Sequence, residues 1–377
     1  LAAVLRRGTV SCPDMGALSA KMDNLYDASI DYTVRKKGEN QCVGFVASFI
    51  DDRYAPGGER LLEPAAALLG ELVCDPVTYH GRFVPEYFES EKTNLLEAIR
   101  SLINDKRDWA DSRLLRALCD GEAYAVPRLG DEETVDKLQA LKVYTQYRNL
   151  ISTAPLEIIY SGSADLERVK QALAAAFATL PREEVRVIST AAPHVCRESV
   201  QYVEDVLDVT QGKLGMGFSC GSDDMPALLM GNTLFGGSSN SKLFLNVREK
   251  LSLCYYASSL YHRQKGLITV SSGIEFQNYQ RAYDEIMAQL EAVQKGELED
   301  WELEGARSTL LNSYATVGDS QGKLENFYLG QAATGQHETP ADLARAIQDM
   351  TAERICRAMS TVKLDTVYFL KGKEAEA

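Results

Sequence analysis

The chain has 377 residues, of which 45% are hydrophobic and 25% charged, and its net charge is −14. This length exceeds what one core usually supports and suits two domains. The negative charge argues against a nucleic-acid-binding surface and against docking on anionic lipid, because both need a basic face. The sequence contains no apolar run of about 18 residues or more, so it predicts no transmembrane helix.

The first half of the chain shows helical and strand periodicity in alternation. The pattern predicts helices at residues 15–26, 58–73, 85–103, 132–149 and 165–180. It predicts strands at residues 42–50 and 155–162, and the second of these reads as buried.

Residues 181–198 are polar, contain prolines and show no sustained period, which predicts a linker between domains at 1–180 and 199–377. After the linker the pattern starts again. The expected strands are residues 199–206, 209–220, 255–260, 266–274 and 365–372, and the expected helices are residues 225–235, 279–295, 299–314 and 340–359.

Two internal similarities link the halves. TNLLEAIRSL, which starts at Thr93, aligns with STLLNSYATV, which starts at Ser308, an offset of 215 residues. LEIIYSG and VYFLKG end at Gly162 and Gly372, an offset of 210 residues. The near-equal offsets predict a duplicated α+β domain.

The eight cysteines are widely spaced and form no C-x-x-C motif, which excludes a zinc ribbon and a thioredoxin-type site. Most are expected to pack as small hydrophobes in a reducing compartment, so a cytoplasmic location is expected. The chain opens on Leu1 without an initiator methionine, which suggests that its front is missing. A targeting segment would then be invisible, and export stays open.

Local motifs for catalysis are sparse. The four histidines, His80, His194, His262 and His337, have no second histidine or cysteine at metal-ligand spacing, and we expect them to pack as surface or polar residues. The glutamates at 89, 91 and 97 read as a solvated helix face. FGGSSNSKLF lacks the spacing of a phosphate-binding loop and is expected to be a plain loop with a serine N-cap.

The stretch GGSSNSKLFLNVREKLSLCY, which ends at Tyr255, carries the strongest signal. It resembles the insulinase, pitrilysin and mitochondrial-processing-peptidase family of zinc metallopeptidases, whose second domain has two glycines and then S-R-L-F-x-x-[IV]-R-E-x-x-x-L-x-Y. Lys242 stands where arginine is common. LRRGT at the front resembles the family's L-F-K-G-T, LYDAS its G-x-x-N-A-x-T segment, and SEKTNLLEAIR its E-R-x-V-V-L-E-E-I-R helix. The ordered set covers nearly the whole chain. The resemblance implies an α+β fold of two related domains, each a mostly antiparallel sheet flanked by helices, arranged as a clamshell.

The resemblance also exposes a departure from the family. Active members carry H-x-x-E-H, which ends two residues before the leucine of L-F-K-G-T, and this spacing implies Ala2 and Ala3 at the catalytic glutamate and second histidine. The third ligand position, counted from Glu91, is Ala98. A methyl group offers no lone pair to a metal and no base to water. We therefore expect no cofactor in this chain, with zinc only in a partner subunit.

In the family, the arginine and tyrosine that match Arg248 and Tyr255 face the zinc and can hydrogen-bond the oxyanion of the scissile carbonyl. The resemblance further implies that LYDAS lies at a sheet edge that takes a peptide as an added strand, which points to Asp27, Ala28 and Ser29 as substrate-binding residues. An ordinary ion pair, a plain sheet residue and an unpartnered edge strand are the alternatives for these residues.

The expected function is that of a non-catalytic subunit of a heterodimer. It would supply Arg248 and Tyr255 to a zinc-bearing homologue and help to enclose an unfolded peptide. Two alternatives stay open: a structural or peptide-holding scaffold without a part in hydrolysis, and a homodimeric protease with a hidden zinc site.

Overall fold

The computed structural model describes residues 1–186 and 192–373, which form two compact units. Unit 1 contains Leu1–Lys36, Gln41–Arg100 and the described residues from Arg128 to residue 186. Unit 2 contains Lys37–Asn40, Ser101–Pro127 and the described residues from residue 192 onward. Residues 187–191 of the predicted linker lie outside the described residues.

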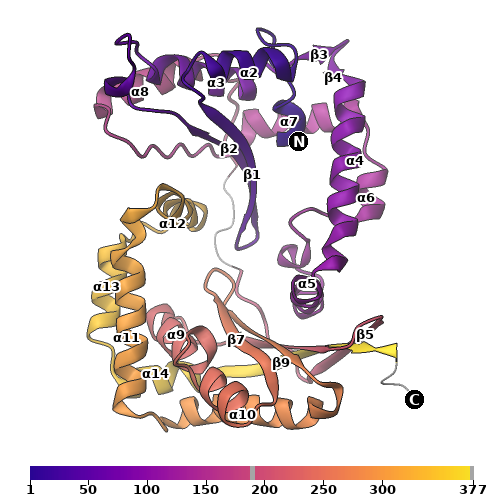
Figure 1. Cartoon of the computed structure of the whole chain (residues 1–377), viewed down its shortest axis with the longest axis vertical. Coiled ribbons are helices and arrows are strands. Elements are labelled where there is room, and N and C mark those ends of the chain that lie inside the picture. The colour runs from indigo at the N-terminus through magenta and orange to yellow at the C-terminus, as the bar shows by residue number, and fades with distance from the viewer. Residues whose placement is uncertain (187–191, 374–377) are drawn as a thin grey trace. The chain divides into compact units, whose positions relative to one another are not determined.

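Unit 1 combines a β-hairpin with several helices (Figure 1). The strands β1 and β2 pair with each other, and the short strands β3 and β4 form a second antiparallel pair. Helix α3 packs on α8 through apolar residues of both helices. The elements are α1 (Ala2–Leu5), α2 (Met15–Asp23), β1 (Ser29–Lys37), β2 (Asn40–Ser48), α3 (Leu62–Cys74), β3 (Thr78–Tyr79), β4 (Arg82–Phe83), α4 (Pro85–Ser101), α6 (Glu132–Asp136), α7 (Ala140–Thr153) and α8 (Leu166–Ala176).

Two sequence predictions for unit 1 are wrong. The region 132–149 contains two helices, because α6 ends at Asp136 after burying Val135, and α7 buries Tyr147 against Phe83. Residues 155–161 form no strand, and Leu156 is 45% exposed. A strand needs hydrogen-bonding neighbours, and none of the described strands pairs with this segment.

Unit 2 is built on a five-stranded sheet in the order β5-β9-β6-β8-β7. The pair β5–β9 is parallel and the other pairs are antiparallel, so the sheet is mostly antiparallel, as expected. Its strands are β5 (Gln201–Leu207), β6 (Gly212–Cys220), β7 (Cys254–His262), β8 (Leu267–Ile274) and β9 (Val362–Gly372). Its helices are α5 (Lys106–Leu118), α9 (Met225–Asn232), α10 (Tyr279–Lys295), α11 (Asp300–Ala315), α12 (Gln321–Thr334), α13 (Pro340–Gln348) and α14 (Ala352–Met359).

Strand β6 shows how the sequence places helices on both faces of this sheet (Figure 1). Successive strand residues face opposite sides, and Leu214, Met216 and Phe218 belong to the main core of the unit. On the other face lie Gly215 and Gly217, against which α5 packs. A Cβ atom at Gly217 would come within 2.7 Å of Leu118 Cδ2. The missing side chains therefore let α5 approach the sheet closely.

The duplication predicted from sequence extends to whole elements. Helices α4 and α11 begin at Pro85 and Asp300, 215 residues apart, and α5 and α12 begin at Lys106 and Gln321, again 215 residues apart. In both copies one turn of 3₁₀-helix joins the two helices, at Leu102–Asn104 and Val317–Asp319.

Other predictions for unit 2 need correction. Helices α5 and α12 were not predicted, and residues 340–359 form two helices instead of one. The break falls at Asp349–Thr351, where Met350 is buried and the Thr351 side chain caps the first turn of α14. A buried apolar residue and a capping hydroxyl favour a new helix over continuation.

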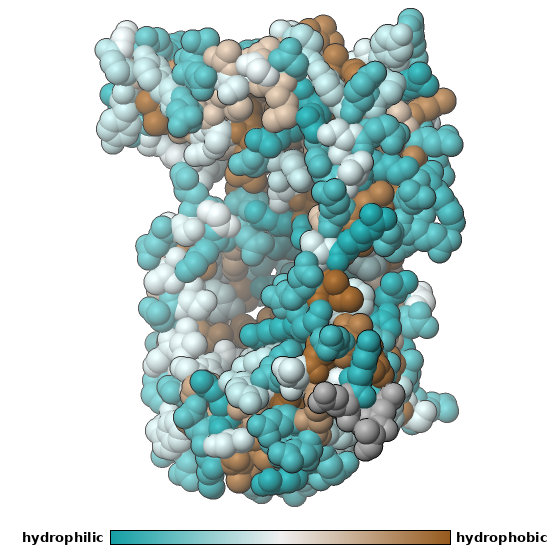
Figure 2. Space-filling view, turned by 45° about the vertical axis from the view of Figure 1, so that its right-hand side comes forward, coloured by the Kyte–Doolittle hydropathy of each residue, from teal (hydrophilic) through white to brown (hydrophobic). Residues whose placement is uncertain are grey.

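The face of the molecule in Figure 2 is largely hydrophilic, with smaller apolar areas between polar side chains. This distribution agrees with the charged composition. Among the described residues, no helix is both long enough and apolar enough to cross a bilayer.

Candidate functional site

Arg248 lies on a π-helical stretch, Leu243–Lys250, that follows the small-residue loop. The backbone N–H of Leu251 donates to Asn246 O at 3.0 Å, a spacing of five residues. Leu243 and Val247 are fully buried and fix the inner side of this stretch. A π-helical turn is rare and occurs frequently at functional sites, because it changes the direction of the side chains that follow it.

Tyr255 occupies a β-bulge at the start of β7. Cys254 pairs with Ile274 and Tyr256 pairs with Gly273, so Tyr255 is an extra residue between two successive pairs. The preceding Ser252 has a φ of 49°, which is uncommon for a residue with a side chain. A bulge redirects a side chain out of the ladder, and the Tyr255 side chain is 58% exposed.

The π-helical stretch and the bulge bring Arg248 and Tyr255 to one cavity of about 440 Å³. Tyr255 Oη donates to Glu275 Oε1 at 3.4 Å, and Arg248 Nε lies 3.5 Å from Glu249 Oε1. The cavity is lined by Arg248, Glu249, Ser252, Leu253, Cys254, Tyr255, Glu275 and Asn278. Sequence reasoning missed Glu275 and Asn278, because they follow β8, in a segment distant from the motif.

The lining residues supply hydrogen-bond donors from Arg248 and Tyr255, together with the carboxylates of Glu249 and Glu275. The long contacts of Arg248 and Tyr255 are weak, and the Arg248 guanidinium also stacks on the Phe244 ring at 4.7 Å, which leaves its N–H groups able to donate to a ligand in the cavity. Burial raises the pKa of the Cys254 thiol, against the opposing influence of Ser272 and the Arg248 charge. Cys254 is therefore a thiol at neutral pH, and a guanidinium and a phenol remain to bind a carbonyl or a carboxylate.

A buried ion pair holds the loop that leads to Arg248. Lys242 Nζ lies 3.0 Å from both carboxylate oxygens of Glu302, at the start of α11. Glu302 also accepts from the N–H of Glu299 and completes a capping box. The N-cap position of the stretch is Lys242, without a side-chain cap, and not the serine that the sequence predicts, although Ser241 Oγ accepts a long hydrogen bond from Phe244 N at 3.4 Å.

The alanines at the expected metal-ligand positions lie in unit 1, on α1 and α4. Ala2 is buried, and Ala3 and Ala98 are half-buried. Arg7 follows α1 and reaches α4, where its Nη2 donates to Ser90 Oγ at 2.7 Å and its Nε to Glu91. Glu91 is thus part of an ion pair, which corrects the expectation for this residue, whereas Glu89 and Glu97 are exposed as expected. Among the described residues, no group of three metal-capable side chains includes α1 or α4.

Comparison with known proteins gives the family of the chain. Residues 137–310 match the family model described as "Peptidase M16 inactive domain". The chain is 35% identical over 378 residues to "Probable inactive metalloprotease YmfF" of Bacillus subtilis (strain 168), across 98% of this chain and 88% of that protein. The chain belongs to the M16 peptidase family. It is also 22% identical to "Uncharacterized zinc protease YmxG" of the same organism, across 83% of this chain and 76% of that protein.

Solved M16-like structures share the fold. A conserved protein from Enterococcus faecalis V583 superposes with a TM-score of 0.86 at 25% identity, over 99% of this chain and 88% of that one. A peptidase M16 inactive domain from Pseudomonas fluorescens superposes with a TM-score of 0.77 at 18% identity, over 98% of this chain and 86% of that one. The α+β fold with antiparallel sheets, predicted from the sequence, is therefore confirmed.

The predicted peptide-binding residues lie at the start of β1, which pairs only with β2 among the described strands. Asp27 has a φ of 60°, and Ser29 opens the strand. The N–H of Ala28 donates to Met22 O at 3.2 Å. Of the two backbone groups of Ala28, this N–H is therefore already engaged and could not bind an added peptide strand. Arg6 Nε donates to the carbonyl of Ile30 at 2.8 Å. Substrate binding by Asp27, Ala28 and Ser29 stays a prediction.

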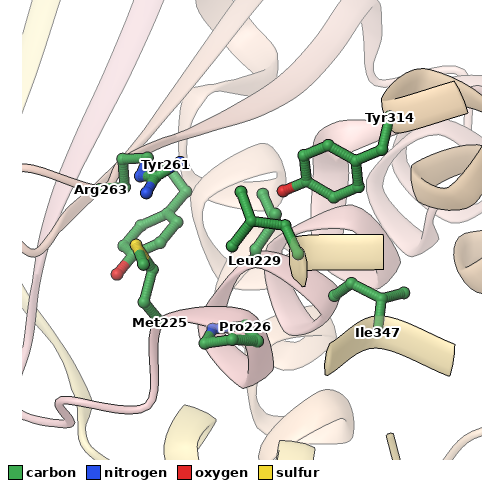
Figure 3. A pocket seen from close by; sticks show the side chains of 8 residues that line it. Met225, Pro226, Leu229, Tyr261, Arg263, Tyr314 and Ile347 are labelled. Carbon is green, nitrogen blue, oxygen red and sulfur yellow. The ribbon is translucent and has the colours of Figure 1, made fainter. Parts of the chain in front are cut away.

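A second pocket, which Figure 3 shows, lies among α9, α11 and α13. Its volume is about 40 Å³, little more than one water molecule occupies in the liquid. It is lined by Met225, Pro226, Leu229, Tyr261, Arg263, Tyr314, Leu343 and Ile347. Such a pocket is too small for a peptide, and Arg263 at its edge is engaged with Gln336 at 2.9 Å. The larger cavity at Arg248 and Tyr255 is the better candidate site.

Proposed function

We propose that this M16 family member is a non-catalytic subunit that pairs with a zinc-bearing homologue and contributes Arg248 and Tyr255 to the shared site. The observation that carries the proposal is that both side chains line one cavity and keep only long polar contacts there. A phenol and a guanidinium whose polar contacts are this long can donate to a developing oxyanion, which is worth about 10²- to 10³-fold in turnover per donor.

The alanines at the expected metal-ligand positions are the second argument for a shared site. Ala2, Ala3 and Ala98 cannot ligate a metal, so the metal and the base that activates water would come from the partner. In Bacillus subtilis one relative is named an inactive metalloprotease and another a zinc protease, so both kinds occur in a single organism. A cytoplasmic, peptide-binding heterodimer is the form in which we propose that this chain acts.

The test is to mix the purified chain with the H-x-x-E-H homologue from the same source and to measure peptide cleavage. Cleavage is expected only when both chains are present. Tyr255→Phe should lower kcat about 100- to 1000-fold, because it removes one oxyanion donor. The mass of the complex, from light scattering, should not change.

Tyr202→Phe is the matched control, since Tyr202 is an exposed tyrosine of the same sheet and lies outside the cavity. Equal kcat for wild type and Tyr255→Phe would remove the proposed role of the phenol. Formation of the complex without any gain in cleavage would instead favour the structural scaffold.

A further inference from the structure

A group of buried polar side chains lies at the C-terminal end of α5 in unit 2, apart from the cavity. Cys119 and Glu122 follow α5, and His194 precedes β5. One ligand atom from each lies within 4.8 Å of the others. Cys119 is fully buried and the His194 side chain is 3% exposed. No other group of three metal-capable side chains occurs in the part of the chain that the structure describes.

A buried carboxylate orients the histidine. His194 Nε2 lies 3.2 Å from Asp365 Oδ2. Asp365 is fully buried, and it also accepts from the N–H of Arg197 at 2.8 Å and from Thr366 Oγ1 at 2.8 Å. Because a carboxylate accepts, Nε2 carries the hydrogen. A metal-bound histidine almost always donates its second nitrogen in this way, to a carboxylate or a carbonyl.

The other ring nitrogen faces a second carboxylate. His194 Nδ1 lies 2.6 Å from Glu122 Oε1. At that distance a proton lies between the two atoms, and a metal ion takes the place of the proton only if they move apart. Cys119 Sγ completes a set of three donors around this point, which a shared proton would not need.

The surrounding charges suit a divalent cation. Lys265 Nζ contacts the other carboxylate oxygen, Oε2 of Glu122, and lies 2.5 Å from Glu39 Oε1. The carboxylates of Glu39, Glu122 and Asp365 together with a Cys119 thiolate are balanced by Lys265, Arg197 and one divalent ion. Lys265 occupies only one oxygen of Glu122, so Oε1 remains for the ion.

We propose that Cys119, Glu122 and His194 form a structural zinc site, with water as the fourth ligand and Asp365 as the residue that positions the histidine. The thiolate and the imidazole favour zinc over magnesium or calcium. Tetrahedral zinc sets its ligands about 3.3 to 3.8 Å apart, so Nδ1 and Oε1 need to separate by about 1 Å. The ion would fasten the segment before β5 to the end of α5. This site is buried in unit 2. It is therefore distinct from the expected catalytic-metal position on α1 and α4 of unit 1, where this chain has alanines.

Cobalt binding tests the site directly. Co²⁺ is titrated into the reduced, metal-free chain, without a histidine tag, and absorption spectra are recorded. One equivalent should produce the intense visible bands of tetrahedral cobalt and a thiolate-to-cobalt charge-transfer band. Zinc should then displace cobalt and bleach both features.

Cys119→Ser should abolish the charge-transfer band, and His194→Gln should weaken cobalt affinity at least tenfold. Cys220→Ser is the control, since it replaces another buried thiol of unit 2 and should leave the spectrum unchanged. Circular dichroism of each variant should match that of the wild-type chain, which checks that the variants are folded.

The proposal is overturned if the wild-type chain gives no thiolate band, or if Cys119→Ser retains it. In either case the cluster is an ion-pair network only. Zinc that Cys119→Ser retains in elemental analysis would point to a different site and would bear on the hidden-protease alternative instead.

Discussion

Residues 155–161 of unit 1 and strand β9 of unit 2 hold equivalent places in the duplicated chain, yet only β9 is a strand. Both segments are largely apolar; β9 ends in Gly372, and Gly162 follows residues 155–161. In β9, Leu370 is fully buried, whereas Leu156 in unit 1 is 45% exposed. The difference lies in the neighbours, because β9 is held between β5 and β6, and no described strand flanks residues 155–161.

This contrast shows what the sheet of unit 2 adds to a local pattern. An extended apolar segment becomes a strand when its backbone groups find partners and its side chains find a core. In unit 2 the main core lies on one face of the sheet and α5 on the other. In the described part of unit 1, residues 155–161 have neither a paired strand nor a core on each face.

The largest expected effect comes from equal truncations in the two segments. Leu370→Ala should lower the free energy of unfolding by about 2 to 5 kcal/mol, because it leaves a cavity beside Leu114 and Tyr368. Leu156→Ala should change it by less than about 0.5 kcal/mol. Urea denaturation followed by circular dichroism measures both. Equal losses would mean that residues 155–161 are packed as tightly as β9.

A second test uses glycines in the two sheets. Gly217→Ala should cost about 1 to 3 kcal/mol, because its Cβ would lie 2.7 Å from Leu118 Cδ2 and push α5 away. A Cβ at Gly44, in β2, meets nothing within 4 Å. Gly44→Ala should therefore leave stability unchanged or raise it slightly. The same urea series reports both variants, and a neutral Gly217→Ala would contradict close packing of α5.

The smallest expected effect is a pH dependence in unit 1, where α3 and α8 share an ion pair. Hydrogen bonding to Arg168 lowers the pKa of Glu63 to about 2, from an ordinary value of 4.5. Ionised Glu63 therefore stabilises the fold above about pH 4.5, and this contribution is lost as the pH falls toward 2. Solvent screens the pair, so we expect less than about 1 kcal/mol.

Arg168→Met should remove most of this dependence and part of that from Asp52, whose pKa is also lowered by the hydrogen bond from the Leu61 N–H. The stability difference between wild type and variant should be larger at about pH 5 than at about pH 3. Arg60→Met is the control. Arg60 is exposed and contacts Glu63 but not Asp52, so its replacement should change the pH dependence of stability less than Arg168→Met does. A difference that does not vary with pH would show that Arg168 acts by packing alone.

The sequence predicted the family motif at Arg248 and Tyr255 without any fold, because the motif is contiguous and its spacing is characteristic. It also indicated the duplication, since repeated helices keep their apolar spacing. It did not reveal that a π-helical stretch and a β-bulge would bring Arg248 and Tyr255 to one cavity. Backbone irregularities of this kind depend on buried neighbours such as Val247, and not on local propensity.

By itself, then, the sequence determined the α+β class and the repeated helices, because both depend on local spacing. Through its resemblance to the family it also indicated the mostly antiparallel sheet and the alanines at the expected ligand positions. Only the tertiary structure decided that α5 packs on the sheet of unit 2, that residues 155–161 form no strand, and that Cys119 and Glu122 meet His194. These outcomes depend on contacts between residues far apart in the chain, and no local pattern encodes which distant partner a side chain finds.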